Sequence, residues 1–157
     1  MKKTVNGAES ASARDVSTVA VGEELPEFEL PLTLQRLVME AGVNRDFTPL
    51  HYDLEDTRQT GAPGAYANTM LIEAMMEAML RNWMGNVGEL RELNLKMISF
   101  NLAGTVIRTG GRVVDVTRDE DRGLVEAELW MRSGEIPTVE GTAVLALPWG
   151  EGGSEKP

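Results

Sequence analysis

The 157-residue chain contains no cysteine and only one histidine. The absence of cysteine excludes disulfides, cysteine nucleophiles and thiolate metal ligands. One histidine among scattered carboxylates provides too few ligands for a transition-metal site, so we expect no metal and no cofactor. No apolar run approaches the roughly 18 to 20 residues that span a bilayer, and the N-terminus lacks an apolar signal region. The sequence therefore predicts a cytoplasmic protein.

Positive charge is scarce as well. The chain has 15 Lys and Arg residues against 25 Asp and Glu residues, which gives a formal net charge of −10. An acidic surface repels nucleic acids and anionic lipids, so we expect neither a nucleic acid nor a membrane as a partner. The simplest role of this charge is solubility.

The length and the hydrophobic content of 42% are typical of one globular domain. Residues 1–20 are small and polar and show no periodic pattern, so we expect a disordered N-terminal arm. Residues 150–157 have a similar composition and are expected to form a flexible tail. The folded domain then covers residues 21–149.

Residues 69–84 give the strongest helical signal in the chain. They contain no Gly or Pro and are apolar almost all round, apart from a stripe of Glu73, Glu77 and Arg81 at i, i+4 spacing. Residues 34–41 also have apolar positions at helical spacing. A short helical turn is expected over residues 54–60, with Asp53 as its N-cap.

Strands dominate the rest of the predicted domain, over residues 28–33, 93–100, 104–108, 112–118, 124–132 and 138–147. The segments 109–111 and 118–123 are rich in Gly or charge and predict hairpin turns, so the sheet should be antiparallel. The fold class is therefore α+β, a single hot-dog domain in which the sheet wraps around a long central helix. An open sheet edge favours a dimer or a larger assembly.

The single histidine lies in the segment Asp46-Phe47-Thr48-Pro49-Leu50-His51. Pro49 fixes its own φ and pushes Thr48 out of the helical region, so Asp46 and His51 are expected on a stiff, irregular loop. Such a loop can aim a carboxylate and an imidazole at the same small volume and hold a water there. A lone histidine in a loop is more often structural, and only the whole segment favours a catalytic role.

Residues 46–51 resemble the Asp-x-Asn-Pro-aliphatic-His signature of the MaoC-like, or (R)-specific enoyl-CoA hydratase, family of hot-dog proteins. Residues 64–71 resemble the Gly-x-Ile-Ala-His-Gly-Met-Leu-like stretch that opens the central helix in that family. The 23-residue step from Asp46 to Thr69 matches the family spacing, and the resemblance covers roughly residues 21–147. Arg45, Thr48 and Thr69 stand where the family usually has Gly, Asn and Gly.

This resemblance implies the addition of water across the 2,3 double bond of a trans-2-enoyl-CoA thioester, or the reverse reaction. Asp46 and His51 would be catalytic, one taking a proton from the water and the other delivering a proton to Cα. The backbone N–H of Thr69 would stabilise the developing oxyanion. The implied substrate-binding residues are Thr48, Tyr66 and Asn68.

Within the family, the chain is most similar to the small MaoC-like subunit of actinobacterial steroid side-chain enoyl-CoA hydratases. This similarity implies a bulky, steroid-like acyl group. It also implies a second MaoC-like hot-dog subunit as a partner, with a homodimer as the alternative.

Three other functions stay open at this point. The chain could be an acyl-CoA thioesterase with the same fold, although the Asp46–His51 spacing favours a hydratase. It could be a dehydratase for carrier-protein substrates, but such carriers are acidic and an acidic surface would repel them. It could also be a non-catalytic subunit that supports a partner hydratase.

Overall fold

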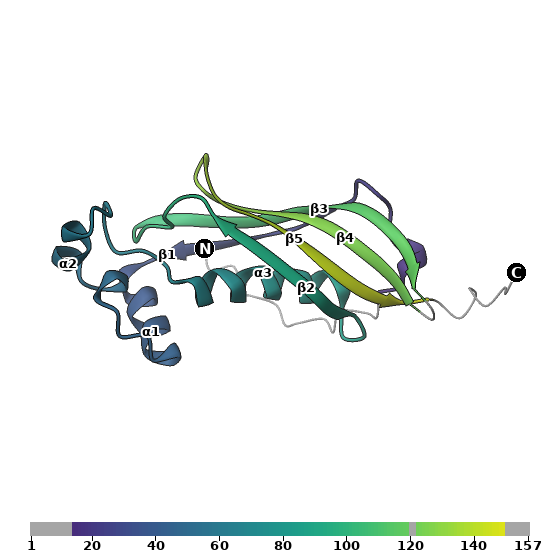
Figure 1. Cartoon of the computed structure of the whole chain (residues 1–157), viewed down its shortest axis with the longest axis horizontal. Helices are drawn as coiled ribbons and strands as arrows, with labels where there is room; N and C mark the ends of the chain where they lie inside the picture. Colours follow the sequence, from purple (N-terminus) through teal and green to yellow (C-terminus); the bar gives the residue numbers. More distant parts are fainter. Residues whose placement is uncertain (1–13, 120–121, 150–157) are drawn as a thin grey trace, which may run out of the picture.

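A curved antiparallel sheet wraps around one long helix in the computed structural model of the protein, which describes residues 14–119 and 122–149 (Figure 1). The helix is α3 (Thr69–Met84), and the sheet has the strand order β1-β3-β4-β5-β2. Its strands are β1 (Glu24–Leu32), β2 (Glu89–Met97), β3 (Thr105–Asp119), β4 (Arg122–Ser133) and β5 (Ile136–Pro148). The expected α+β hot-dog fold is confirmed.

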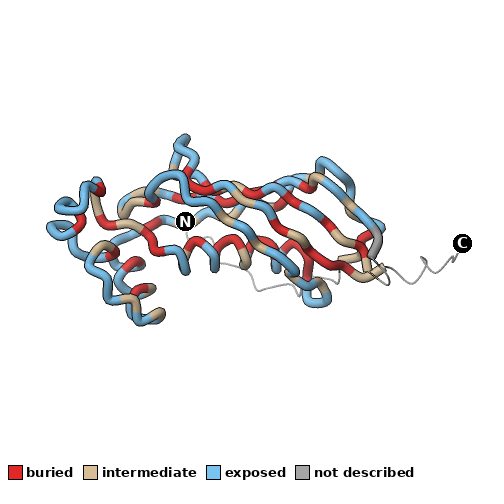
Figure 2. The backbone as a smooth tube through the Cα atoms, viewed as in Figure 1, coloured by how far each residue is buried: buried red, intermediate tan, exposed pale blue. Residues whose placement is uncertain are grey.

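Helix α3 begins and ends at the residues predicted from the sequence. The Asn68 side chain caps its N-terminus, and Gly85, with φ 74°, ends it. On its polar stripe, Arg81 Nε donates to Glu77 Oε1 at 2.7 Å. One face of the helix is buried, as the red segments of α3 in Figure 2 show, whereas Ala74, Ala78 and Asn82 beside the polar stripe are exposed. The buried face explains the large apolar side chains of the helix, and the exposed face keeps only small or polar residues apart from Met70.

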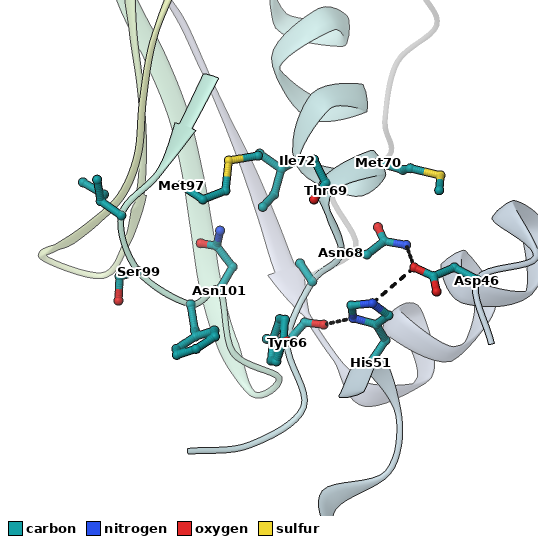
Figure 3. Close-up of a pocket in the computed structure, with 13 residues that line it drawn as sticks. Asp46, His51, Tyr66, Asn68, Thr69, Met70, Ile72, Met97, Ser99 and Asn101 are labelled. Atoms are coloured by element: carbon teal, nitrogen blue, oxygen red, sulfur yellow. Dashed lines mark hydrogen bonds and ion pairs between the residues drawn. The ribbon is translucent and has the colours of Figure 1, made fainter. Parts of the chain in front are cut away.

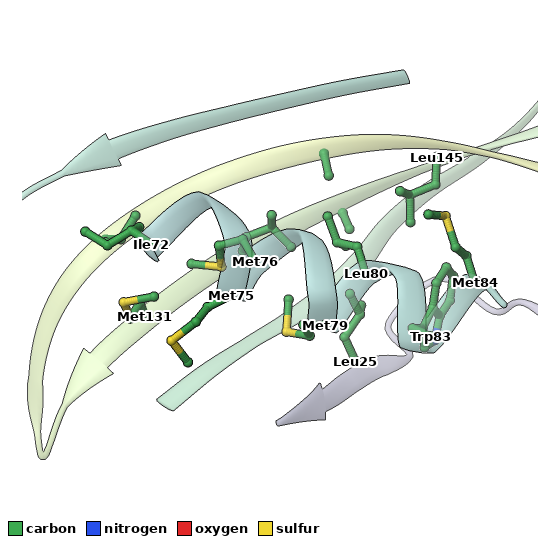
Figure 4. Packing of buried hydrophobic residues seen from close by; sticks show 14 of the residues in the cluster. Leu25, Ile72, Met75, Met76, Met79, Leu80, Trp83, Met84, Met131 and Leu145 are labelled. Atoms are coloured by element: carbon green, nitrogen blue, oxygen red, sulfur yellow. The ribbon is translucent and has the colours of Figure 1, made fainter. Parts of the chain in front are cut away.

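The hydrophobic core lies between α3 and the concave face of the sheet (Figure 4). Met76, Met79, Leu80 and Met84 of α3 are completely buried in it. They pack with residues from several strands, among them Leu25, Met131, Val139 and Leu145. Methionine is unbranched and fills irregular gaps, which suits a helix enclosed by a curved sheet.

The N-terminal arm was predicted too long. Residues 14–20 belong to the fold, and they include a short 3₁₀ helix, η1 (Val16–Thr18). Val16 is 2% exposed and packs where a side chain on Gly123 would lie, so the absence of a side chain there makes room for it. The prediction failed because isolated valines, Val16 and Val19, in a polar segment give no periodic signal. Residues 1–13 and the expected tail, 150–157, lie outside the described residues.

The hairpin predicted at residues 109–111 is wrong, because Gly110 and Gly111 lie inside the single long strand β3. Gly110 pairs with Trp130 of β4, and a Cβ on Gly110 would lie 2.1 Å from the Trp130 ring. The glycine is therefore present for a close approach of an aromatic ring and not for a turn.

The remaining helices lie together at one end of the sheet (Figure 1). They are α1 (Leu34–Asn44), the 3₁₀ helix η2 (Pro49–His51) and α2 (Leu54–Gln59). Asp53 caps α2 as predicted, accepting from the N–H groups of Glu55 and Asp56. Strand β2 ends at Met97, earlier than predicted, and an irregular loop connects it to β3. This loop and the segment before α3 lie side by side, since Tyr66 forms an isolated bridge with Leu102.

Candidate active site

The end of α1 sets the position of Asp46. Arg45 adopts a left-handed conformation, with φ 56°, and the next N–H, that of Asp46, donates to Ala41 O at 2.9 Å. This hydrogen-bond pattern is a common way to end a helix and usually uses glycine at the left-handed position. Beyond Asp46, Thr48 has an extended conformation, as expected for a residue before proline, and its N–H donates to Asp46 Oδ1 at 3.3 Å.

His51 is held at the end of η2 and is only 7% exposed. Its Nδ1 lies 2.9 Å from the backbone O of Tyr66, and its Nε2 lies 3.2 Å from Asp46 Oδ2. A carbonyl oxygen can only accept, so Nδ1 carries a proton and donates it. Nε2 is then the nitrogen that faces the carboxylate. The expected meeting of the carboxylate and the imidazole is thus present in the structure.

Asn68 connects this pair to α3. Its Oδ1 accepts from the N–H of Leu71 at 3.0 Å, which caps the helix, and its Nδ2 donates to Asp46 Oδ2 at 3.1 Å. One amide side chain therefore satisfies a free N–H of the first helical turn and orients the Asp46 carboxylate.

These hydrogen bonds lower the pKa of Asp46 below its ordinary value. The Thr48 side chain has the largest effect, followed by the Asn68 amide; the positive charge of His51 in its protonated form has the smallest effect, and partial burial acts in the opposite direction. Hydrogen bonds to the ionised form of a carboxyl group favour that form. Asp46 is therefore a carboxylate at neutral pH.

The Asp46–His51 pair lies on the wall of a cavity of about 490 Å³ (Figure 3). The N-terminal turn of α3 contributes Thr69, Met70 and Ile72 to the wall, and the segment before it contributes Tyr66, Ala67 and Asn68. The first N–H groups of a helix have no partner within the helix, so the Thr69 N–H is available to a ligand at this position.

Five of the six predicted site residues line this cavity, and one does not. Asp46, His51, Tyr66, Asn68 and Thr69 line it. Thr48 is absent from its wall and instead contacts Asp46.

Sequence reasoning missed one whole side of the cavity, which the end of β2 and the following loop form. Its residues are Met97, Ile98, Ser99, Phe100 and Asn101. Because residues 93–100 read as a continuous strand, no signal marked them as lining a cavity. The sequence offers one sign that this segment lines a cavity: the apolar residues Ile98 and Phe100 lie next to the single Asn101.

Within residues 14–119 and 122–149, no group of three or more His, Cys, Asp or Glu side chains is arranged to hold a metal ion. In the same part of the chain, no helix combines the length and the apolar character needed to cross a bilayer.

Comparisons with known proteins place the fold. No protein-family model matches the chain, and no curated protein matches it by sequence. Among solved structures, the ChsH1-ChsH2 complex from Mycobacterium tuberculosis is similar to it, with 20% identity, 83% of this chain and 99% of that chain covered, and a TM-score of 0.74.

Two further structures are similar to the chain. The (R)-hydratase from A. caviae involved in PHA biosynthesis has 19% identity, covers 83% of this chain and 98% of its own, and has a TM-score of 0.75. The MaoC-like dehydratase from Rhodospirillum rubrum has 16% identity, with coverages of 87% and 98% and a TM-score of 0.75. The chain therefore has the hot-dog fold of the MaoC-like hydratases and dehydratases.

Proposed function

We propose that this protein is an enoyl-CoA hydratase, in which Asp46 and His51 activate a water that adds to a trans-2-enoyl-CoA thioester. The observation that carries the proposal is the 3.2 Å approach of His51 Nε2 to Asp46 Oδ2 on a cavity wall, next to the N-terminus of α3. A base, a bound water and an oxyanion donor within one cavity are the components that such an addition needs.

The hydrogen bond to Tyr66 O supports the role of His51. In the neutral form of the ring, with the Nδ1 proton donated to that carbonyl, Nε2 has a free lone pair beside the Asp46 carboxylate. Two acceptors side by side repel each other unless a donor satisfies both. A water in front of the pair donates one O–H to each, and this arrangement aims the water oxygen at the substrate.

In this mechanism the Asp46–His51 pair takes up one proton and gives up one proton in each turnover. As the water oxygen bonds to Cβ, the pair takes one proton from the water and the C=C electrons shift to form an enolate on the thioester oxygen. The pair then delivers one proton to Cα, the enolate collapses to the carbonyl, and both side chains return to their starting protonation states. General acid–base catalysis of this kind contributes about 10²–10⁴-fold in rate.

The N–H of Thr69 is the donor for the enolate oxygen. It lies at the N-terminus of a 16-residue helix, where the free N–H groups and the helix dipole favour negative charge. Thr69 has a side chain where the family has none, but it offers the same backbone group. Loss of one such donor costs about 10²–10³-fold in turnover rate.

The proposed acyl group of the substrate follows from the other residues that line the cavity. Apolar side chains of Ile72, Met97, Ile98 and Phe100 border the cavity and suit an acyl group. The finer proposal is a bulky, steroid-like acyl group on coenzyme A, in line with the resemblance of the segment around Asp46. Tyr66 and Asn68 contact the substrate near the reacting carbons, and Thr48 acts on it only through Asp46.

A second hot-dog subunit is part of the proposal. β2 is an edge strand of the sheet and offers unpaired backbone groups to another chain. Near the cavity, Met70, Met97, Ile98 and Phe100 are each at least 38% exposed, which is a large apolar surface for a single chain. A MaoC-like partner or a second copy of this chain would cover both features.

The assay that tests this function follows two products from one substrate. Purified protein is mixed with trans-2-enoyl-CoA esters, short and steroid-like, with and without a co-expressed MaoC-like partner. We expect loss of the conjugated enoyl absorbance without release of free thiol. Release of thiol would identify a thioesterase instead, and a protein inactive under all conditions would contradict the proposal.

A further inference from the structure

Asn101 is the one buried polar side chain of the cavity wall that no partner satisfies within the described residues. It is 1% exposed, and neither its Nδ2 nor its Oδ1 has a hydrogen-bond partner. The other amide of the wall, that of Asn68, uses both of its polar atoms. A buried amide without partners lowers stability, so its presence calls for a partner that the free chain does not supply.

The backbone fixes Asn101 firmly beside the cavity. Its carbonyl accepts from the N–H of Ala67 at 2.9 Å, and the neighbouring N–H of Ala103 donates to Ala65 O at 2.8 Å. These bonds tie the loop after β2 to the segment that leads into α3. The terminal torsion of an asparagine is broad and shallow, so the amide can turn toward the cavity while the backbone stays in place.

The location indicates which part of a ligand would reach Asn101. In Figure 3, Asn101 lies across the segment Tyr66–Thr69 from Asp46, among the apolar residues that follow β2. The nucleotide of an acyl-CoA needs an open mouth, whereas Asn101 is almost fully buried. The pantetheine arm is the same in every coenzyme A ester, so Asn101 can distinguish esters only through a group in the acyl portion of the substrate.

We propose that Asn101 selects acyl groups that carry a hydroxyl away from the reacting double bond; this inference rests on the proposed function. A hydroxyl accepts from Nδ2 and donates to Oδ1, so it satisfies both atoms, whereas a ketone oxygen satisfies Nδ2 alone. A plain hydrocarbon chain satisfies neither. A site with buried polar groups rejects ligands that leave those groups unpaired, so the order of preference is hydroxyl, then ketone, then plain chain.

Binding of non-reacting esters tests this order without relying on turnover. Isothermal titration of the full chain, alone and with the co-expressed MaoC-like partner, would compare octanoyl-CoA with its hydroxy and oxo analogues, substituted at positions 4 to 8. We expect the best hydroxy isomer to bind about tenfold more tightly than octanoyl-CoA, as for one net hydrogen bond. Asn101→Leu, which has nearly the same volume, should bind octanoyl-CoA at least as well as the hydroxy esters.

Thermal unfolding separates a ligand-binding role from a structural one. If Asn101 has no partner in the free protein, Asn101→Leu raises the melting temperature; if the amide holds the fold together, the melting temperature falls and the inference fails. Asn94→Leu is the matched control, because Asn94 is an exposed β2 residue whose amide binds Glu92. That variant should keep the preference for hydroxy esters.

The outcomes distinguish this inference from the proposed function. Equal affinities for all esters in the wild type would overturn the selection by Asn101 and leave hydration of trans-2-octenoyl-CoA unaffected. A clear preference in binding without any hydration would support Asn101 and contradict the hydratase. A failure to bind any ester would overturn both.

Discussion

Four groups from different parts of the chain meet at the candidate site: the Asp46 carboxylate after α1, the His51 ring at the end of η2, the Asn68 amide before α3, and the Tyr66 carbonyl. The sequence predicted Asp46 and His51 because proline and spacing make a recognisable local segment. It also placed Asn68 next to the helix. It could not predict that the Asn68 amide would bind Asp46, because that contact joins residues 22 positions apart.

Thr48→Val should raise the pKa of Asp46 toward its ordinary value, because the Thr48 side chain is the largest contributor to the lowered pKa. Carbon NMR titration of the Asp46 carboxyl measures the change directly. The hydroxyl is lost and the Thr48 N–H is kept, so we expect a partial shift. An unchanged pKa in the variant would refute the assigned cause.

The lowered pKa of Asp46 also predicts how stability depends on pH. Its folded pKa lies below its unfolded one, so its contribution is present above the ordinary carboxyl range and is lost as the pH falls through the folded pKa. The stability difference between wild type and Asp46→Asn, from urea unfolding, should therefore shrink toward acid pH. A difference that grows on acidification would show that the sign is wrong.

At the scale of elements, α3 performs two tasks through one residue, since Asn68 caps it and orients Asp46. Asn68→Ala should lower the free energy of unfolding by about 1 kcal/mol through loss of the cap. Asn68→Ser keeps a capping oxygen but is too short to reach Asp46. We expect the serine variant to retain most of the stability and still lose activity. If both variants lose stability and activity in parallel, the two tasks are not separable.

Strand β3 shows where local reading of the sequence fails. Two consecutive glycines read as a turn, yet the strand continues because Trp130 of the neighbouring strand occupies the space beside Gly110. That partner is distant in sequence, so no local pattern reveals it. By contrast, α3 and the cap of α2 were predicted correctly because apolar composition and capping residues act within a few positions.

Gly110→Ala tests this reading of β3. The added methyl would collide with the Trp130 ring, so we expect a loss of about 1–3 kcal/mol in the free energy of unfolding, measured with denaturant. Gly42→Ala is the matched control, because Gly42 lies in α1 with no atom near the added Cβ. Alanine there should stabilise the protein by up to about 1 kcal/mol. Equal effects at both positions would contradict the packing argument.

For the whole molecule, the expected layers and the antiparallel connections were predictable, because one long apolar helix requires a sheet to enclose it. The side of the cavity that the β2–β3 loop forms was not predictable, because the sequence of that loop resembles the end of a strand. The open β2 edge and the exposed apolar side chains near the cavity are the two features on which the proposed second subunit rests.

Light scattering at several concentrations tests that assembly. We expect a mass of at least twice the 17.2 kDa of one chain, either alone or with a co-expressed MaoC-like partner. A mass of one chain under both conditions would contradict the proposed second subunit.

The central claim is that the Asp46–His51 pair activates the attacking water, and a comparison of kcat/KM for three single substitutions tests it most directly. In the assembled protein, Asp46→Asn and His51→Gln should each lower kcat/KM for hydration about 10²–10⁴-fold, with the protein still folded and the affinity for a saturated ester largely kept. Asp56→Asn removes the same charge from the exposed first turn of α2 and should leave the rate unchanged. Near wild-type turnover in both site variants would make this chain a scaffold for a partner's chemistry.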